Sequence, residues 1–250
     1  MKYIITMLIF LFFSNSSALI IESNKLSTVL DYIDTSLNTL VIFDIDNTLA
    51  HPIAELSSDE WFCYLIDKKM AQGHDYLTSI YYALPAAYYA QFYTPLEPTE
   101  PGIPGLIKDL IDRGVAVIAL STRSIFIAER TLDQLDNIHI TFFAPNIDPH
   151  DLVLPMPHPC FYKNGILFGG NNNKGEVLKC FFDIMNYHPE KVIFIDDKLK
   201  YLMAVENALT GHDIVFCGIR YSGCDERVKN FDPRKAEEQY RKLREKKVFS

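Results

Sequence analysis

The sequence predicts an α/β protein, a Rossmann-like three-layer sandwich with a central parallel sheet. Three short apolar runs, 40–43, 115–120 and 191–195, have the length and the β-branched and aromatic content of buried strands. Each run ends in polar residues, and ligands of parallel α/β sheets bind beyond the carboxyl ends of the strands. With 250 residues, 48% hydrophobic and 22% charged, the chain is long enough for one large domain with an insertion.

Two aspartates follow the first apolar run. Asp44 and Asp46 are spaced i, i+2, so both carboxylates point the same way if the strand continues to Asp44. Two like charges at this distance raise each other's pKa unless a cation lies between them. Mg²⁺ takes hard oxygen ligands and often only one or two carboxylates, so the pair favours a magnesium site. A strand followed by an acidic turn without a function is the alternative interpretation.

Polar residues also follow the other two runs. The second run leads into Ser121, Thr122 and Arg123, and the third ends at the acidic pair Asp196 and Asp197. A lone lysine, Lys174, follows a glycine- and asparagine-rich turn and precedes a helix predicted over 175–185. The hydroxyl residue and the lysine are weak signals by themselves, and the order of all the positions along the chain gives them weight.

This set of residues resembles the four motifs of the haloacid dehalogenase (HAD) superfamily. The motifs are Asp-x-Asp-x-Thr, a hydroxyl residue at a strand end, a lone lysine and an acidic pair at a strand end. In this chain they are Asp44-Ile45-Asp46-Asn47-Thr48, Ser121, Lys174 and Asp196-Asp197. The resemblance covers roughly residues 38–220, and it implies the HAD fold with a small helical cap inserted after the first strand.

The resemblance implies a Mg²⁺-dependent phosphomonoester hydrolase that acts through an aspartyl-phosphate on a small phosphorylated metabolite or nucleotide. Asp44 would be the nucleophile and Asp46 the general acid and base. The metal ligands would come from Asp44, Asp46 (through its backbone carbonyl), Asp196 and Asp197, the last directly, through water or by orienting the shell.

The remaining motif residues would bind the substrate. Ser121 and Lys174 would hold the phosphoryl oxygens, with Thr122 beside them, and Thr48 would steady the loop after the nucleophile. Arg123 suits a phosphate contact, and a salt bridge to the next helix is an equally supported alternative.

Other functions on the same motifs stay open. Haloacid dehalogenases proper lack an Asp at the position of Asp46, so this residue favours phosphoryl transfer over dehalogenation. A catalytically silent HAD-fold binding or effector protein and a phosphotransferase are the alternatives. The motif type and the export signal described below are similar to those of the secreted class B and class C acid phosphatases, and more faintly to an uncharacterised group of exported HAD-like bacterial proteins.

The formal charge of −8 argues against a nucleic-acid backbone or an anionic membrane as the main partner. It does not oppose a small phosphorylated substrate, because a bound metal reverses the local sign of charge. No sequence feature indicates an oligomeric state.

Residues 1–18 have the composition of a secretory signal peptide. Lys2 precedes an apolar stretch over 3–13, and Ser16 and Ala18 fit the small-residue rule for cleavage. The stretch is shorter than the ~20 residues of a spanning helix. We therefore expect an exported protein, periplasmic or secreted, without a membrane span after cleavage. An uncleaved N-terminal anchor is the alternative.

The predicted divisions are a signal peptide (1–18), a core (19–50 and 102–250) and a helical cap (51–101). Ser57 and Glu60 form a capping-box pattern before a helix ending at Met70. An Asn-Gly pair predicts a hairpin over 161–168. The other predicted helices are 22–37, 76–93, 105–113, 124–135, 199–209 and a solvated helix over 234–247, and the other predicted strands are 139–143 and 213–220.

Two groups of residues allow two interpretations each. Cys217 and Cys224 have a spacing that suits a local disulfide, whereas the five cysteines are otherwise explained as small buried residues. The many aromatic residues of the cap suit stacking on a base, sugar or leaving group, or packing of the cap against the core.

Overall fold

The computed structural model describes residues 19–145, 147–148 and 150–247. Its main sheet has eight strands in the order β1-β10-β9-β2-β5-β8-β7-β6. The strands from β1 to β8 in this order are parallel, and β7 and β6 are antiparallel at one edge. Their bounds are β1 Leu19–Ser23, β10 Val215–Tyr221, β9 Lys191–Asp196, β2 Thr39–Phe43, β5 Ala116–Ser121, β8 Ile166–Phe168, β7 Cys160–Lys163 and β6 Leu152–Leu154. The predicted α/β class with a central parallel sheet is confirmed.

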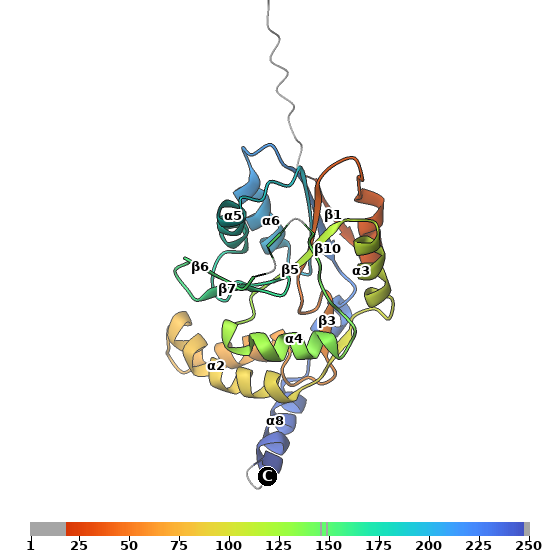
Figure 1. Ribbon diagram of the computed structural model, residues 1–250. Coiled ribbons are helices and arrows are strands. Elements are labelled where there is room, and N and C mark those ends of the chain that lie inside the picture. Colours follow the sequence, from red (N-terminus) through yellow and green to blue (C-terminus); the bar gives the residue numbers. More distant parts are fainter. Residues whose placement is uncertain (1–18, 146, 149, 248–250) are drawn as a thin grey trace, which may run out of the picture.

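Both faces of the sheet are buried, which explains why β2 is apolar throughout. Val41 and Phe43 point into one hydrophobic cluster and Leu40 and Ile42 into the other. The first cluster includes residues of η1 (Leu26–Tyr32), α3 (Ile103–Asp112) and α4 (Ala128–Asp136), and the second includes residues of α5 (Lys174–Met185) and α6 (Leu199–Leu209). Figure 1 shows α5 and α6 on one side of the sheet and α3 on the other, so the domain has three layers.

The predicted hairpin forms, and the predicted strand before it does not. Asn164 and Gly165 both have positive φ, 47° and 79°, in the turn between β7 and β8. β8 pairs with the end of β5 from Ala119 onward, so little of β5 remains for the segment 139–143. That segment makes one bridge, between Val117 and Phe143, and the prediction of a strand there was wrong. The three-residue strand β6, which pairs with β7, was not predicted.

The first described residues form a strand and a short helix in place of the helix predicted over 22–37. β1 pairs in parallel with β10 along its whole length, from Leu19 opposite Cys217 to Ser23 opposite Tyr221. The following 3₁₀ helix η1 buries Leu26 and Val29, two of the residues on which the helical prediction rested. The residues with helical spacing therefore form a helix only over Leu26–Tyr32. The residues before this helix form a strand instead, because they pair with the edge of β10.

Two helices, α1 (Asp59–Met70) and α2 (Tyr76–Tyr93), form the insertion after the first motif strand, as predicted. The two-stranded sheet of β3 (Ala50–Pro52) and β4 (Leu96–Pro98) closes the base of this insertion. The N-cap of α1 is Ser58, whose Oγ accepts a hydrogen bond from the Trp61 amide. Ser57 was predicted there, but it adopts a φ of 76°, whereas an N-cap is extended. The domain limits 51–101 stay a prediction.

The charged tail forms α8 (Pro233–Lys247), preceded by the short helix α7 (Asp225–Lys229) that was not predicted. α8 packs against the insertion: Ala236 is fully buried in one cluster with Leu56, Trp61 and Ala90. In Figure 1 α8 extends from the end of the molecule where α2 lies. The predicted docked helix therefore packs on the insertion.

All five cysteines are free thiols, and Cys160, Cys217 and Cys224 are buried. The structure thus supports the interpretation of buried cysteines over a disulfide between Cys217 and Cys224. The predicted signal peptide, 1–18, lies outside the described residues. Among the helices in the described part of the chain, none has both the length and the apolar character needed to cross a membrane.

The packing of α5 on α6 depends on Gly175. A Cβ atom at this position would lie 2.1 Å from the carbonyl oxygen of Ala204 and 2.8 Å from the Cβ of Ala208. We expect Gly175→Ala to lower the free energy of unfolding by about 1–3 kcal/mol or more, because two backbones would have to separate. Urea denaturation followed by circular dichroism measures this.

The matched control is Gly105→Ala in α3, where nothing lies within 4 Å of the added Cβ. This variant should gain about 0.5–1 kcal/mol from the better helix propensity of alanine. A Gly175→Ala protein as stable as the wild type would contradict the packing argument.

Candidate active site

Three neighbouring parallel strands bring the predicted motif residues to one edge of the sheet. Phe43 at the end of β2 lies opposite Ile195 of β9 on one side and Ala119 of β5 on the other. The residues that follow, Asp44, Asp196 and Ser121, therefore emerge together at the carboxyl ends of the strands. The backbone N–H of Asp44 donates a 2.9 Å hydrogen bond to the Ile195 carbonyl, which extends the pairing to the first motif residue.

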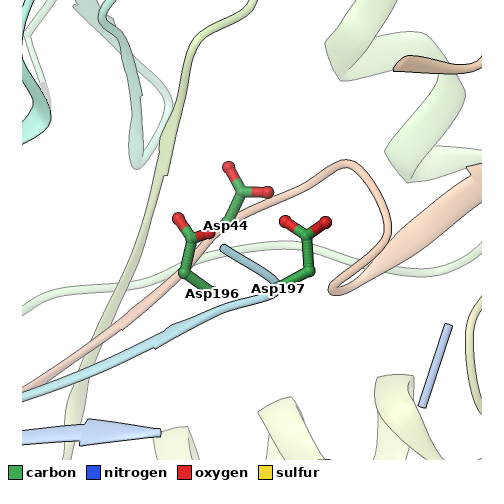
Figure 2. A group of neighbouring side chains, drawn as sticks. All are labelled: Asp44, Asp196 and Asp197. Carbon is green, nitrogen blue, oxygen red and sulfur yellow. The ribbon is translucent and has the colours of Figure 1, made fainter. Parts of the chain in front are cut away.

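Asp44, Asp196 and Asp197 form a carboxylate cluster. Each offers an oxygen, and these oxygens all lie within 4.8 Å of one another. Figure 2 shows the three side chains gathered at the ends of their strands. Asp44 and Asp196 are buried, and Asp197 is partly exposed. Hard oxygen donors of this kind fit Mg²⁺, which completes its coordination with water and substrate oxygens.

Lys174 lies against this cluster. It is the first residue of α5, whose N-cap Asn173 accepts hydrogen bonds from the Gly175 and Glu176 amides. The Lys174 ammonium donates to Oδ1 of Asp44 at 2.5 Å and to Oδ2 of Asp196 at 2.7 Å, and the residue is 1% exposed. Burial alone would lower the pKa of Lys174, but the two carboxylates outweigh it and raise the pKa. The lysine is therefore a fixed positive charge.

The pKa values of two cluster carboxyls are raised, mainly because burial penalises their charged forms. Burial, together with the charges of Asp196 and Asp46 and against the opposing effect of Lys174, raises the pKa of Asp44 to about 7. Burial and the neighbouring charges of Asp44 and Asp196 raise the pKa of Asp197 to about 9. A divalent cation would displace these protons, because metal ligands must be deprotonated.

Arg123 binds Asp46. Its Nε and Nη2 donate to the two carboxylate oxygens of Asp46, each at 2.8 Å, and the arginine is only 4% exposed. Its Nη1 donates to Thr131 at 3.2 Å and to Gln134 at 2.9 Å, both on α4. The predicted salt bridge of Arg123 to the next helix was wrong in its partner: the salt bridge is with Asp46, and Arg123 donates only hydrogen bonds to the next helix.

This bidentate pair sets Asp46 apart from the carboxylate cluster. Burial alone would raise the pKa of Asp46, but the charge and hydrogen bonds of Arg123 outweigh it and lower the pKa. The Asp46 carboxylate is not in the group of three carboxylates, and the metal contact through its backbone carbonyl stays a prediction. Gln134 also donates to the carbonyls of Gln91 (3.0 Å) and Thr94 (2.7 Å), which links the pair to the end of α2.

The predicted hydroxyl residues occupy different environments. Ser121 is buried at the end of β5, and its Oγ accepts a 3.1 Å hydrogen bond from the Arg123 amide. Thr122 is exposed. The Oγ1 of Thr48 accepts a 3.0 Å hydrogen bond from the Asp197 amide, and its carbonyl accepts one from the Thr99 hydroxyl. Thr48 therefore joins the loop after β2 to the acidic pair after β9.

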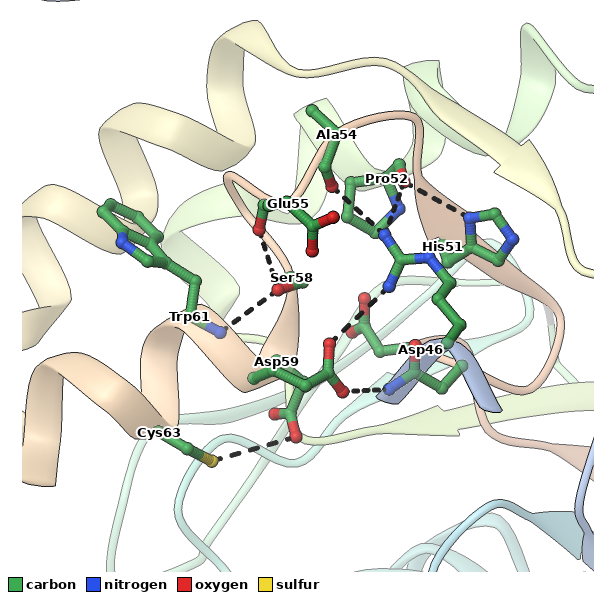
Figure 3. Close-up of polar contacts among 12 residues, drawn as sticks. Asp46, His51, Pro52, Ala54, Glu55, Ser58, Asp59, Trp61 and Cys63 are labelled. Carbon is green, nitrogen blue, oxygen red and sulfur yellow. Dashed lines mark hydrogen bonds and ion pairs between the residues drawn. The ribbon is translucent and has the colours of Figure 1, made fainter. Parts of the chain in front are cut away.

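The first turn of α1 contributes contacts that the sequence did not indicate. Glu60 accepts a 2.7 Å hydrogen bond from Asn47, which has a positive φ of 59° in the loop after Asp46. Arg227 lies 3.6 Å from the other Glu60 oxygen and donates to the carbonyls of Pro52 and Ala54. Figure 3 shows this region around Asp46, Pro52 and Ala54. The sequence signal for this contact was Asn47 in the first motif, because asparagine tolerates a positive φ.

A second contact of this turn joins Asp59 to Lys198. The Lys198 ammonium forms an ion pair with the Asp59 carboxylate, across 139 positions of sequence. Asp59 lies beside Ser58 and Cys63 in Figure 3. Lys198 follows the acidic pair directly, and that position is the signal that marks it as a candidate site residue.

A family model described as "Protein of unknown function (DUF2608)" matches residues 22–249. A Chlamydia muridarum protein named "Putative outer membrane protein" is 28% identical over 192 residues, 77% of this chain and 72% of that protein. A Chlamydia trachomatis protein of the same name shows the same identity and coverage, and a Chlamydia pneumoniae relative is 26% identical over 184 residues, 74% of this chain and 69% of its own length.

Among solved structures, one titled "Phospho-Aspartyl Intermediate Analogue of Phosphoserine phosphatase" aligns with a TM-score of 0.38 and 17% sequence identity. The alignment covers 77% of this chain and 98% of that one. A similarity of this size says nothing about the site.

The carboxylate cluster predicts that Mg²⁺ stabilises the protein. Mg²⁺ at 100 times its dissociation constant should raise the free energy of unfolding by about 2.7 kcal/mol. Asp197→Asn should weaken this stabilisation, because it removes one carboxylate of the cluster. Thermal unfolding with Mg²⁺ and with EDTA measures the effect, and Asp213→Asn, at an exposed aspartate, is the control. Equal stabilisation of the wild type and Asp197→Asn would contradict the assignment.

Mg²⁺ binding should also depend on pH. The pKa values of Asp44 and Asp197 are raised to about 7 and about 9, so both carboxyls hold protons at about pH 6. Protons compete with the metal, so the affinity should increase from about pH 6 to about pH 8, with protons released on binding. Calorimetric titration in two buffers of different ionisation enthalpy measures the release. Affinity that falls with rising pH would show that these carboxyls are not the ligands.

Proposed function

We propose that this chain, which belongs to the DUF2608 family of proteins of unknown function, is a Mg²⁺-dependent phosphomonoester hydrolase of the HAD phosphatase type. The observation that supports this most is the cluster of Asp44, Asp196 and Asp197 with Lys174 at the carboxyl ends of the parallel strands. Mg²⁺ held by these carboxylates and the Asp46 carbonyl would offset the repulsion between an anionic nucleophile and an anionic substrate.

The first step forms a covalent intermediate on Asp44. An oxygen of its carboxylate attacks phosphorus, the bond from phosphorus to the leaving oxygen breaks, and an aspartyl-phosphate results. Asp46 gives a proton to the leaving oxygen. Lys174 holds Asp44 in place through its 2.5 Å hydrogen bond, and Ser121, with Thr122 beside it, binds the transferred phosphoryl group.

The second step releases phosphate. A water molecule attacks phosphorus, Asp46 accepts its proton, and the Asp44 carboxylate is restored. Arg123 lowers the pKa of Asp46, so this residue is ionised and ready to act as a base. The proton that Asp46 accepts from this water is the one that it gives to the leaving oxygen of the next substrate molecule.

The cell envelope or exterior is the proposed location. The N-terminal 18 residues have the composition of an export signal. The name of the chlamydial relatives, "Putative outer membrane protein", supports an envelope location for this chain. The substrate class in this proposal is a small phosphorylated metabolite or a nucleotide.

A catalytically silent binding or effector protein is the second candidate. The observation that favours it is the bidentate contact of Arg123, which occupies both oxygens of the expected general acid and base, Asp46. A protein of this kind would keep the metal and phosphate sites and lack turnover.

Hydrolysis of p-nitrophenyl phosphate separates the two candidates. We expect turnover with Mg²⁺ and none with EDTA, and loss of turnover in Asp44→Asn because no nucleophile remains. Asp213→Asn, at an exposed aspartate, should keep wild-type activity. A folded, Mg²⁺-loaded protein that is inactive between about pH 4 and about pH 8, a range that covers the ordinary and raised pKa values of Asp44, would support the silent protein.

The leaving group reports on Asp46. Asp46→Asn should slow hydrolysis of an alkyl phosphate by about 10²–10⁴-fold, the usual contribution of general acid–base catalysis. The first step with p-nitrophenyl phosphate needs no acid, so a burst of p-nitrophenol should persist in this variant while steady-state turnover falls. Loss of the burst would show that Asp46 acts in the first step even with a good leaving group.

A further inference from the structure

The two cations expected to hold the substrate phosphate are already bound to carboxylates. Lys174 donates to Asp44 and Asp196 and is 1% exposed. Arg123 makes four hydrogen bonds, to Asp46 and to two residues of α4, and is 4% exposed. Neither side chain presents a free charged face to a ligand that arrives from solvent.

Lys198 is a cation of a different kind. Its backbone N–H donates to Oδ1 of Asp196 at 2.8 Å, so the residue is fixed next to the carboxylate cluster. Its side chain is 32% exposed, and its ammonium lies 5.9 Å from the centre of the Tyr201 ring. Lys198 is therefore attached next to the cluster, and its side chain is partly exposed to solvent.

The partner of Lys198 is a carboxylate of the insertion. Asp59 lies in the first turn of α1, its side chain is 25% exposed, and it forms an ion pair with the Lys198 ammonium. The next residue, Glu60, holds α1 to the loop after Asp46 through Asn47. Partly exposed ion pairs contribute little stability, typically less than about 1 kcal/mol. A phosphate dianion, with more charge and more acceptor oxygens than a carboxylate, competes well for such a lysine.

We propose that Lys198 binds the phosphate group of the substrate, and that the Asp59 carboxylate occupies Lys198 when no substrate is bound. The assignment rests on the proposed function in so far as it takes a phosphomonoester as the ligand. The insertion then contributes to substrate selection through one charge: an anion must displace Asp59 to reach Lys198. Weakly charged ligands fail to do so, and phosphomonoester dianions succeed.

Binding of inorganic phosphate to the Mg²⁺-loaded protein, measured by calorimetry, tests the assignment without turnover. Lys198→Ala should weaken phosphate binding by about 10-fold to about 100-fold, the range for one lost hydrogen bond between charged groups. Lys198→Arg should restore part of it. Asp59→Asn should tighten phosphate binding, because the competing negative charge is gone. The control is Lys200→Ala, which removes an exposed lysine of the same segment.

The variant at Asp59 distinguishes ligand binding from a structural ion pair. If the pair only holds α1 to the core, Asp59→Asn and Lys198→Ala should weaken phosphate binding equally, and that result would overturn the proposal. Circular dichroism checks that each variant is folded, and Asp59→Asn decides the question if Lys198→Ala is not. Kinetics with p-nitrophenyl phosphate should show the Lys198→Ala effect in KM, with kcat nearly unchanged.

The outcomes also separate this assignment from the proposed hydrolysis. Phosphate binding with the expected variant pattern, in a protein without turnover, would support Lys198 as the phosphate ligand and reject the hydrolase. Turnover that is unaffected by Lys198→Ala would support the hydrolase and reject the assignment of Lys198. A wild-type protein that binds no phosphate would reject the assignment as well.

Discussion

The contact of Lys174 with Asp44 and Asp196 is the interaction on which the site depends. Two buried carboxylates at the ends of β2 and β9 repel each other strongly in a medium of low dielectric constant, and the lysine offsets that repulsion. Removing one partner of such a buried group typically costs about 3–5 kcal/mol. The lysine reaches the carboxylates because α5 begins there, and α5 lies close to α6 because Gly175 has no side chain. The ends of β2 and β9, the helices α5 and α6, and the contacts of Lys174 therefore depend on one another.

The ion pair of Asp46 with Arg123 is a second group of charges in the site, and it has the opposite effect on a carboxyl pKa. Burial raises the pKa of Asp44, whereas Arg123 lowers the pKa of Asp46 two residues away. Sites that use two carboxylates in different roles commonly give them different pKa values, and here the expected general acid and base is the more acidic of the two. Gln134 extends this second group to the end of α2. One network of hydrogen bonds therefore includes both the ion pair of Asp46 with Arg123 and the end of a helix of the insertion. The insertion contacts the site through this network and through the first turn of α1.

The convergence of the motif residues could be predicted, and several of their partners could not. The apolar runs before Asp44, Ser121 and Asp196 identify buried strands, and parallel strands end at one edge of a sheet. The partner of Arg123 is 77 residues away, and a guanidinium suits a carboxylate and a phosphate equally well. The ion pair of Asp59 with Lys198 depends on how the insertion folds back, which no local pattern specifies. The helix predicted over 22–37 was wrong at its start because residues 19–23 form the edge strand β1, which pairs with β10.

The packing of α8 on the insertion has an experimental consequence. The chain has one tryptophan, and Trp61 is fully buried where α1, α2 and α8 meet, with its ring 5.2 Å from that of Tyr240. Its fluorescence therefore reports the insertion and the C-terminal helix, while circular dichroism reports the helices and strands of the whole chain. Coincident transitions of the two signals would identify one cooperative folding unit. An earlier change in tryptophan emission would identify an insertion that opens while the sheet is still folded, which is the motion expected of a lid.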